Sequence, residues 1–509
     1  MQYAGKAEAA LIVIVTYKSK SRFPDRGLEI HLAPVYPIAT INNNNGSDFV
    51  TDAKKQKEDG FGPLGFGEKV GYGLGDMGFN FYWATISGFL AFFYTDVFGI
   101  SAAAAGTMML ITKIIDAFTD PAMGAIADRT QSRFGKFRPY LLFAALPMTA
   151  AGVLTFTTPD LDQGGKVIWA YLTYSLMMLV YTILSTPYSA LSGVITAQSQ
   201  ERTTLISFRF IAAFAGTTIV NYFTLDLVNL LGKDNQQLGW QLTMGLYGLI
   251  AAAVFAIVFF STRERIAPPP SQQSNVIQDI ADLTKNKPWL ILFFISLVIM
   301  ITIMMRSGTG VYYFKYYVER PDLIGEFLTT YSISLLIGAA ITPILTRFFD
   351  KTKLMMWLMA IVGILSVLYM FIPRDMIWLM FVTQAAIGVT LGPKSPLAFS
   401  MYADTADYTE WKMGRRATAM TFAAATFSQK LGGAIASAGI LWILAAMGYK
   451  ANEAQSDASL MGIVLLLTVI PGVVALFAAF LMRFYTLNDK TLQTVHAELQ
   501  IRKHAENQE

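Results

Sequence analysis

Long apolar segments alternate with short polar loops along most of the chain. A helix needs about 20 mainly apolar residues, at a rise of about 1.5 Å each, to cross the roughly 30 Å hydrocarbon core of a membrane. The segments that reach this length predict spans near residues 69–97, 101–127, 139–157, 167–192, 204–230, 238–261, 288–318, 323–346, 354–373, 375–403, 417–447 and 459–485. The pattern therefore predicts an all-α membrane protein with twelve transmembrane helices.

A polar stretch separates the sixth predicted span from the seventh. It contains three consecutive prolines, Pro268–Pro270, which cannot continue a helix. We therefore predict two six-helix bundles, at 66–262 and 288–485, joined by a linker at 263–287. A basic loop follows the second span, and a fainter echo of it, TRFFDKTK, follows the eighth. Such repetition is typical of transporters whose substrate site lies between two halves near the membrane midplane.

The charge of the short loops predicts the orientation of the helices. The loops after the even-numbered spans hold fifteen lysines and arginines, and the opposite loops hold about six. Since cationic short loops stay in the cytoplasm, we expect the linker and both termini there. Residues 1–65 are polar, with one apolar patch too short to span, and they suggest a disordered extension or a start codon placed too far upstream. Residues 486–509 form a polar cytoplasmic tail.

Composition excludes several classes of protein. Of the 509 residues, 54% are hydrophobic and 15% are charged, whereas soluble domains carry about 25% charged residues. There is no cysteine, and the three histidines, His31, His496 and His504, lie outside the predicted spans. Thiolate chemistry and an intramembrane imidazole are therefore excluded. No Walker-type phosphate loop occurs, and the net charge of +4 is spread over short loops, so we expect no cofactor and no nucleic acid partner.

Ionisable side chains in the second span point to a site, because each costs about 2.5–3.5 kcal/mol to insert at a helix centre. The segment KIIDAFTDP places Lys113, Asp116 and Asp120 at i, i+3 and i+7, on one helix face. Asp116 lies fifteen residues, about 22 Å, from the outer end of its span. Thr182 lies equally deep in the fourth span. Together with Thr119, these oxygens form a candidate cage for Na⁺ or Li⁺, or a proton acceptor.

Four further residues are candidates for substrate binding. Lys430, in TFSQKLGG of the eleventh span, could neutralise the two aspartates while no cation is bound, and Thr426 belongs to the same span. The alternative is that Lys430 and Lys113 only pair with the aspartates and hold the helices together. Arg209, near the inner end of the fifth span, either acts in binding or snorkels to the surface. Lys394 lies beside two prolines that interrupt the tenth span, where it could bind an anionic sugar or form an ion pair.

Polar and aromatic side chains on two spans suit a sugar. Aromatic faces cover the apolar C–H surface of a sugar, while amides and hydroxyls bond its hydroxyl groups. The residues at helical spacing are Asp76, Asn80, Trp83 and Ser87 in the first span, and Tyr181, Ser185 and Tyr188 in the fourth. Packing alone is the alternative for the rings, because aromatic residues make up 13% of the chain.

Ordered motifs carry a family resemblance over residues 66–490. They are GYGLGDMGFNFYW, FFYTDVFGIS, DAFTDPAMG, RFGKFRPY, TPYSAL and ADTADYTEWKMGRRA. In these motifs the chain resembles the glycoside-pentoside-hexuronide:cation symporters, which include the melibiose permease. The resemblance implies the major facilitator fold, a place in the bacterial cytoplasmic (inner) membrane, and sugar uptake coupled to H⁺, Na⁺ or Li⁺ by alternating access.

The resemblance also implies roles for particular residues. Asp116, Asp120 and Thr182 match the family's cation site, and Lys430 and Arg209 match a lysine and an arginine of its helices 11 and 5. The cluster after the tenth span that resembles the cytoplasmic gate is Asp404, Asp407, Glu410, Arg415 and Arg416. For that cluster, a solvated charged loop is the alternative.

This chain departs from the melibiose permease at several positions. Thr119 stands where that protein has an asparagine between its two cation-site acids, which leaves the choice of ion open. Asn80 and Ser185 stand where it has sugar-binding aspartates, so a glycoside other than melibiose is expected. Alternatives to a sugar symporter are a cation-dependent carrier of a lysolipid and a membrane enzyme that uses the aspartate pair as acid and base. The oligomeric state is left open.

Overall fold

The structure, a computed structural model, describes residues 62–196, 198–265, 283–414 and 418–506. All described residues belong to one compact unit, residues 52–509. Most of the expected N-terminal extension and of the linker lies outside the described residues. So do Arg415 and Arg416 of the expected gate.

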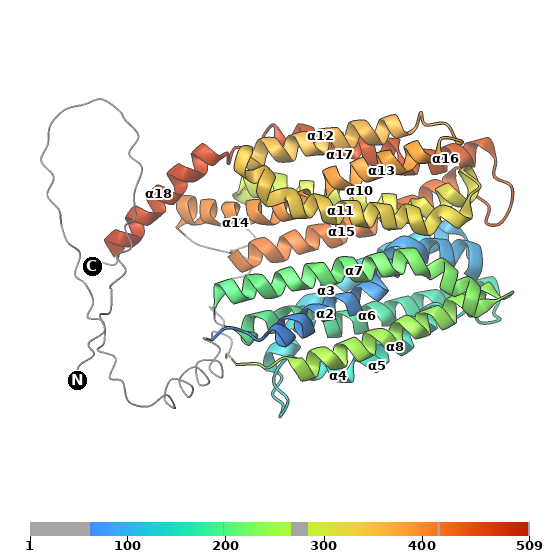
Figure 1. Cartoon of the computed structure of the whole chain (residues 1–509), viewed down its shortest axis with the longest axis horizontal. Coiled ribbons are helices and arrows are strands. Elements are labelled where there is room, and N and C mark those ends of the chain that lie inside the picture. Colours follow the sequence, from blue (N-terminus) through green and yellow to red (C-terminus); the bar gives the residue numbers. More distant parts are fainter. Residues whose placement is uncertain (1–61, 197, 266–282, 415–417, 507–509) are drawn as a thin grey trace, which may run out of the picture. The chain divides into compact units, whose positions relative to one another are not determined.

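Helical segments occupy all twelve predicted spans (Figure 1). We call residues 62–265 the N-terminal half. Its helices are α2 (Phe66–Thr85), continued by the π-helical turns η1 (Ile86–Leu90) and η2 (Phe93–Phe98), α3 (Ala102–Arg129), α4 (Arg138–Phe143), α5 (Ala145–Thr155), α6 (Gln163–Ile195), α7 (Ser199–Gly232) and α8 (Gln236–Ser261).

We call residues 283–506 the C-terminal half. Its helices are α10 (Lys287–Tyr312) with η3 (Tyr313–Tyr317), η4 (Pro321–Leu323) with α11 (Ile324–Phe348), α12 (Lys351–Tyr369), α13 (Ile377–Leu391), α14 (Lys394–Met413), α15 (Thr418–Ala446), α16 (Asp457–Leu467), α17 (Val469–Met482) and α18 (Asp489–Glu506). Eight helices of the described part are long and apolar enough to cross a membrane by length and composition. The other predicted spans are broken into shorter helices or, like α3, carry several charges.

Prolines account for two breaks inside predicted spans. Pro147 follows the junction of α4 and α5, and Pro471 follows that of α16 and α17. A proline has no N–H to donate to the carbonyl four residues earlier. The carbonyl of Leu467, freed in this way, accepts a hydrogen bond of 3.0 Å from the guanidinium of Arg306, which is fully buried in the C-terminal half.

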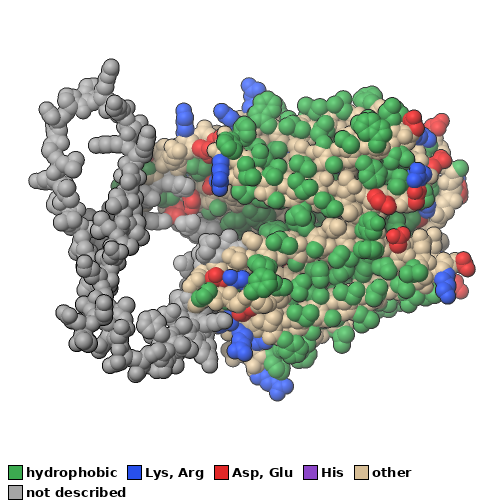
Figure 2. Space-filling view, in the orientation of Figure 1, with side chains coloured by type: hydrophobic (Ala, Val, Ile, Leu, Met, Phe, Trp, Pro, Cys, Tyr) green, Lys and Arg blue, Asp and Glu red, His purple; other side chains and the backbone are tan. Residues whose placement is uncertain are grey.

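Hydrophobic side chains cover the sides of the helices, and charged side chains gather at the two ends (Figure 2). Helices that extend beyond the apolar segments are longer than the sequence predicted. The tenth span was predicted to end at 403, yet α14 continues through polar residues to Met413. The tail, predicted only as a polar segment, forms α18, which packs on α14 through Trp411, whose indole N–H donates to Glu498 at 2.7 Å.

Two glycines let α11 and α13 approach backbone to backbone. A Cβ atom on Gly338 would lie 2.2 Å from the carbonyl oxygen of Val389, and one on Gly392 would lie 2.3 Å from that of Leu335. Small residues at helix contacts of this kind allow close packing in membranes.

We therefore expect Gly338→Ala to lower the thermal stability of the purified protein, because the two backbones must separate. Overpacking of this kind costs about 1–3 kcal/mol. The matched control is Gly439→Ala on α15, where an added Cβ meets nothing within 4 Å. Melting curves in detergent measure both variants, and equal melting temperatures would contradict the packing argument.

Candidate cation and substrate site

Two carboxylates of α3 meet a hydroxyl of α6 in the middle of the helices. The Thr182 hydroxyl lies 2.8 Å from Oδ1 of Asp116 and 3.1 Å from Oδ1 of Asp120. Asp116 and Thr182 are buried, while 29% of the Asp120 side chain is exposed. Three of the four residues proposed for a cation cage therefore lie together.

The ammonium of Lys430, from α15 of the other half, occupies the remaining side of this pair. It lies 3.1 Å from Oδ2 of Asp116 and also contacts Oδ2 of Asp120. A single lysine thus joins the two halves and directly neutralises one of two negative charges. We call Asp116, Asp120, Thr182 and Lys430 the carboxylate cluster.

Lys113 does not complete the neutralisation by direct pairing. Its ammonium lies 4.6 Å from the centroid of the Trp83 ring and 3.8 Å from the sulfur of Met178, and it forms no ion pair with a described residue. A cation over an indole face is attracted by the ring quadrupole. The alternative in which both lysines hold the aspartates is therefore half correct, since only Lys430 is in contact.

A cavity of about 230 Å³ adjoins the carboxylate cluster and lies between the halves. Its lining residues are Asp76, Phe79, Asn80, Trp83, Tyr181, Met300, Thr426, Gln429 and Lys430. We call it the central cavity. Six of the residues predicted for substrate binding line it, and Lys430 belongs to both the cavity and the carboxylate cluster. Ion and substrate sites therefore share one side chain.

The polar wall on α2 is held by hydrogen bonds from α7. The guanidinium of Arg209 donates two hydrogen bonds, of 2.7 and 3.2 Å, to the carboxylate of Asp76. It also lies 4.6 Å from the centroid of the Tyr188 ring. The amide of Asn80 donates to the carbonyl of Asp76 at 2.7 Å and accepts from the hydroxyl of Thr217 at 2.9 Å. Arg209 therefore forms a partly buried ion pair with Asp76 in place of the predicted alternative of snorkelling, and it positions Asp76 without lining the cavity itself.

Three predicted residues lie away from these positions. The hydroxyl of Thr119 donates to the backbone carbonyl of Asp116 at 2.9 Å, as expected of a threonine within a helix. Ser185 is half-buried on α6 and is not among the residues lining the cavity. Lys394 is fully buried at the start of α14, where its ammonium has no hydrogen-bond partner among the described residues. The ion-pair alternative for Lys394 is therefore not observed.

The described residues of the predicted gate lie at the end of the molecule that carries α18. There Asp404 accepts a contact of 2.9 Å from Lys351, a residue of its own half. Asp407 lies one turn further along α14. In this structure Asp404 therefore does not pair with the N-terminal half, as the gate interpretation expected for a closed inner side.

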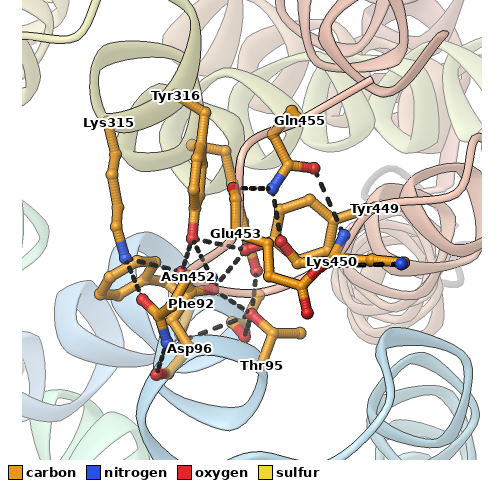
Figure 3. Close-up of polar contacts among 12 residues, drawn as sticks. Phe92, Thr95, Asp96, Lys315, Tyr316, Tyr449, Lys450, Asn452, Glu453 and Gln455 are labelled. Atoms are coloured by element: carbon orange, nitrogen blue, oxygen red, sulfur yellow. Dashed lines mark hydrogen bonds and ion pairs between the residues drawn. The ribbon is translucent and has the colours of Figure 1, made fainter.

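At the opposite end, a network that sequence reasoning missed joins the halves around Asp96 (Figure 3). Lys315 donates to Oδ1 of Asp96 at 2.8 Å, and Tyr449 donates to Oδ2 at 2.5 Å. Tyr316 also contacts the carboxylate, and Asn452 donates to the backbone carbonyl of Asp96 at 2.6 Å. The Asp96 side chain is fully buried. We call this network the Asp96 latch, and its end of the molecule the Asp96 end.

Residues 71–489 match the family described as MFS/sugar transport protein. The chain is 39% identical over 434 residues to the inner membrane symporter YicJ of Escherichia coli, covering 85% of this chain and 94% of that protein. It is 36% identical over 453 residues to the isoprimeverose transporter of Lactiplantibacillus pentosus, covering 86% and 92%. This chain belongs to the MFS/sugar transport family. It is a secondary transporter in the membrane, and the enzyme alternative is not supported.

Solved structures of transporters share the fold of this sugar transport family member. The crystal structure of a D-xylose–proton symporter superimposes with a TM-score of 0.59 at 14% identity, covering 83% of this chain and 98% of that one. The crystal structure of the nucleoside transporter NupG gives 0.57 at 12% identity, covering 82% and 98%. The prediction of an all-α major facilitator fold is confirmed.

Proposed function

We propose that this transporter carries a neutral glycoside into the cell together with one monovalent cation, Na⁺, H⁺ or Li⁺, which binds at the carboxylate cluster. The observation that carries the proposal is the charge count of that cluster. Two carboxylates face one ammonium in direct contact, so one negative charge is left for a mobile cation. Unpaired charge within a membrane protein is costly, and it marks ion pathways.

Coupling follows from the position of Lys430. A cation that binds Asp116 and Asp120 weakens the ion pairs of both carboxylates with Lys430. The ammonium of Lys430 can then turn into the central cavity and donate a hydrogen bond to a sugar hydroxyl. Sugar that engages Lys430 in turn frees the carboxylates for the cation. By linkage, each ligand raises the affinity for the other by the same factor.

Alternating access requires that the halves separate at one end while they close at the other. The Asp96 latch holds one end shut in this structure, and from the loop charges we infer that this end faces the outside of the cell. We propose that Asp404 exchanges Lys351 for partners in the N-terminal half when the cytoplasmic side closes. The chain then lies in the bacterial cytoplasmic membrane with both termini inside.

The lining of the central cavity supports a sugar as the cargo. Asp76, Asn80 and Gln429 offer acceptors and donors for hydroxyl groups, and Trp83 offers a ring face. The lining combines these polar groups with the apolar side chains of Phe79 and Met300, a mixture that is typical of small-molecule sites. Among relatives, one is named an isoprimeverose transporter and another a putative glycoside/cation symporter.

Gradient-driven uptake tests the proposal. Purified protein in liposomes should accumulate a labelled neutral glycoside above its external concentration when one cation gradient, of Na⁺, H⁺ or Li⁺, points inward. Collapsing that gradient with the matching ionophore should reduce uptake to equilibration. Isoprimeverose is the first sugar to test. Uptake that stops at equilibration whichever of the three gradients is imposed would indicate facilitated diffusion and would contradict cation coupling.

A further inference from the structure

A second cavity, of about 370 Å³, lies at the Asp96 end between α7, α8, η3 and the start of α11. It is larger than the central cavity and adjoins the other side of the latch. The aromatic residues in its wall are Phe92, Tyr222 and Trp240, and the polar ones include Asp226, Asn229, Gln236, Lys315, Asp322 and Glu326. We call it the vestibule.

Four polar side chains of the vestibule are not committed to the fold. Asp226, Asn229, Gln236 and Glu326 form no side-chain hydrogen bond or ion pair with any described residue, although all four line one cavity. The ring of Tyr222 is 43% exposed. Free amide and carboxylate oxygens beside an exposed ring are the combination that binds a polyhydroxylated sugar.

The charges of the vestibule narrow the class of ligand. The carboxylate of Asp322 forms an ion pair with Arg320 at 2.6 Å, and the ammonium of Lys315 forms one with Asp96. Asp226 and Glu326 therefore leave the cavity net negative, which repels an anionic sugar such as a glucuronide. A bound metal ion is not indicated either, since no group of three metal-binding side chains occurs among the described residues.

The vestibule and the latch share Lys315. Lys315, which donates to Asp96 and to Asn452 at 2.8 Å each, lies 4.6 Å from the centroid of the Phe92 ring, and both Lys315 and Phe92 line the vestibule. A sugar in the vestibule therefore touches the residue that holds the latch closed. It can offer that ammonium an alternative acceptor.

We infer that the vestibule is a first binding site for a neutral glycoside on the outer face, filled while the Asp96 latch is still closed, and that it rejects anionic glycosides. The inference rests on the proposed function for its cargo and orientation. Net negative charge at this position selects cargo before the central cavity is exposed. The two sites are then occupied in sequence during one transport cycle.

The test needs protein that is held closed at the Asp96 end. The chain has no cysteine, so Thr107→Cys and Trp442→Cys, whose parent side chains meet across the halves at 3.2 Å, can be joined by a short bifunctional maleimide. Neither residue belongs to the latch or to the vestibule. Right-side-out membrane vesicles keep the native orientation, and labelled isoprimeverose and methyl β-xyloside serve as neutral probes.

Tethered vesicles should lose uptake but keep saturable binding of a neutral probe at the outer face, without competition from 4-nitrophenyl glucuronide. Tyr222→Leu should weaken this binding about tenfold, which corresponds to about 1.4 kcal/mol. Phe223→Leu, a neighbouring ring of similar exposure outside the cavity lining, should leave it unchanged. Asp226→Asn with Glu326→Gln should admit the glucuronide as a competitor, whereas Asp234→Asn should not.

The absence of outer-face binding of both probes in tethered vesicles would overturn the vestibule site. So would binding that responds equally to Tyr222→Leu and Phe223→Leu, which would indicate nonspecific adsorption. Untethered vesicles report separately on the proposed function, because they measure accumulation under a cation gradient. Failure of transport and failure of the vestibule are therefore distinguishable.

Discussion

Asp120→Asn should abolish gradient-driven accumulation of sugar while leaving sugar binding largely intact. The substitution removes the residual negative charge, since Asp116 alone still balances Lys430. No net charge is then left to attract the coupling cation. Coupling between two ligands typically amounts to about 1–3 kcal/mol, so we expect a loss of up to about 100-fold in the initial rate of gradient-driven uptake.

The readout that isolates coupling is the ratio of cation-driven uptake to sugar exchange across liposomes with equal ion concentrations. Asp120 does not line the central cavity, so exchange should continue. Asp160→Asn, an exposed acid in the loop between α5 and α6, is the matched control. Retention of concentrative uptake by Asp120→Asn would place the cation elsewhere.

Much of the carboxylate cluster could be predicted from the sequence because helical spacing and depth are local properties. Spacing placed Asp116 and Asp120 on one face of α3, and counting residues gave Thr182 the same depth on α6. The structure brings these three side chains within hydrogen-bond distance. Lys430 could be named as a neutralising group because a lysine that far inside a span is costly unless an acid lies beside it.

Residues whose position depends on tertiary contacts were harder to predict. The Asp96 latch draws its partners from residues 315–316 and 449–452, which nothing in the sequence connects to the end of the first span. Thr119 shares the face of the carboxylates, but its hydroxyl bonds the backbone of its own helix. Lys394 looked like a cavity residue because prolines interrupt the span there. The break between α13 and α14 is real, yet its close helix packing encloses the lysine instead of opening a cavity beside it.

Hydropathy predicts the part of a helix that lies in the membrane, but not how far the helix continues beyond it. Apolar length predicts where a helix must be shielded from water, but a helix that leaves the membrane needs only its backbone hydrogen bonds. The polar ends of α14 and the whole of α18 are of this kind. The prolines beside Lys394, by contrast, predicted the break between α13 and α14, because the missing N–H acts within one turn. Proline alone does not decide, since α6 and α11 continue through Pro187 and Pro343.

Asp76→Asn should eliminate measurable sugar transport and also lower stability, because it leaves the guanidinium of Arg209 without its bidentate partner. Removing one member of a buried ion pair costs about 3–5 kcal/mol. About a fifth of each side chain is exposed here, at 19% for Asp76 and 21% for Arg209, so solvent screening reduces the cost to about 1–3 kcal/mol. Melting temperature and vesicle uptake measure the two effects separately.

The double variant Asp76→Asn with Arg209→Gln distinguishes a structural pair from a sugar contact. It removes both charges, so the melting temperature should recover most of the loss seen in Asp76→Asn. Transport should stay absent, because Asp76 itself lines the central cavity and its carboxylate is the acceptor that Arg209 holds in position. Recovery of uptake together with stability would show that the pair serves only to join α2 to α7. The sugar contacts would then be assigned to Asn80, Trp83 and Gln429 without Asp76.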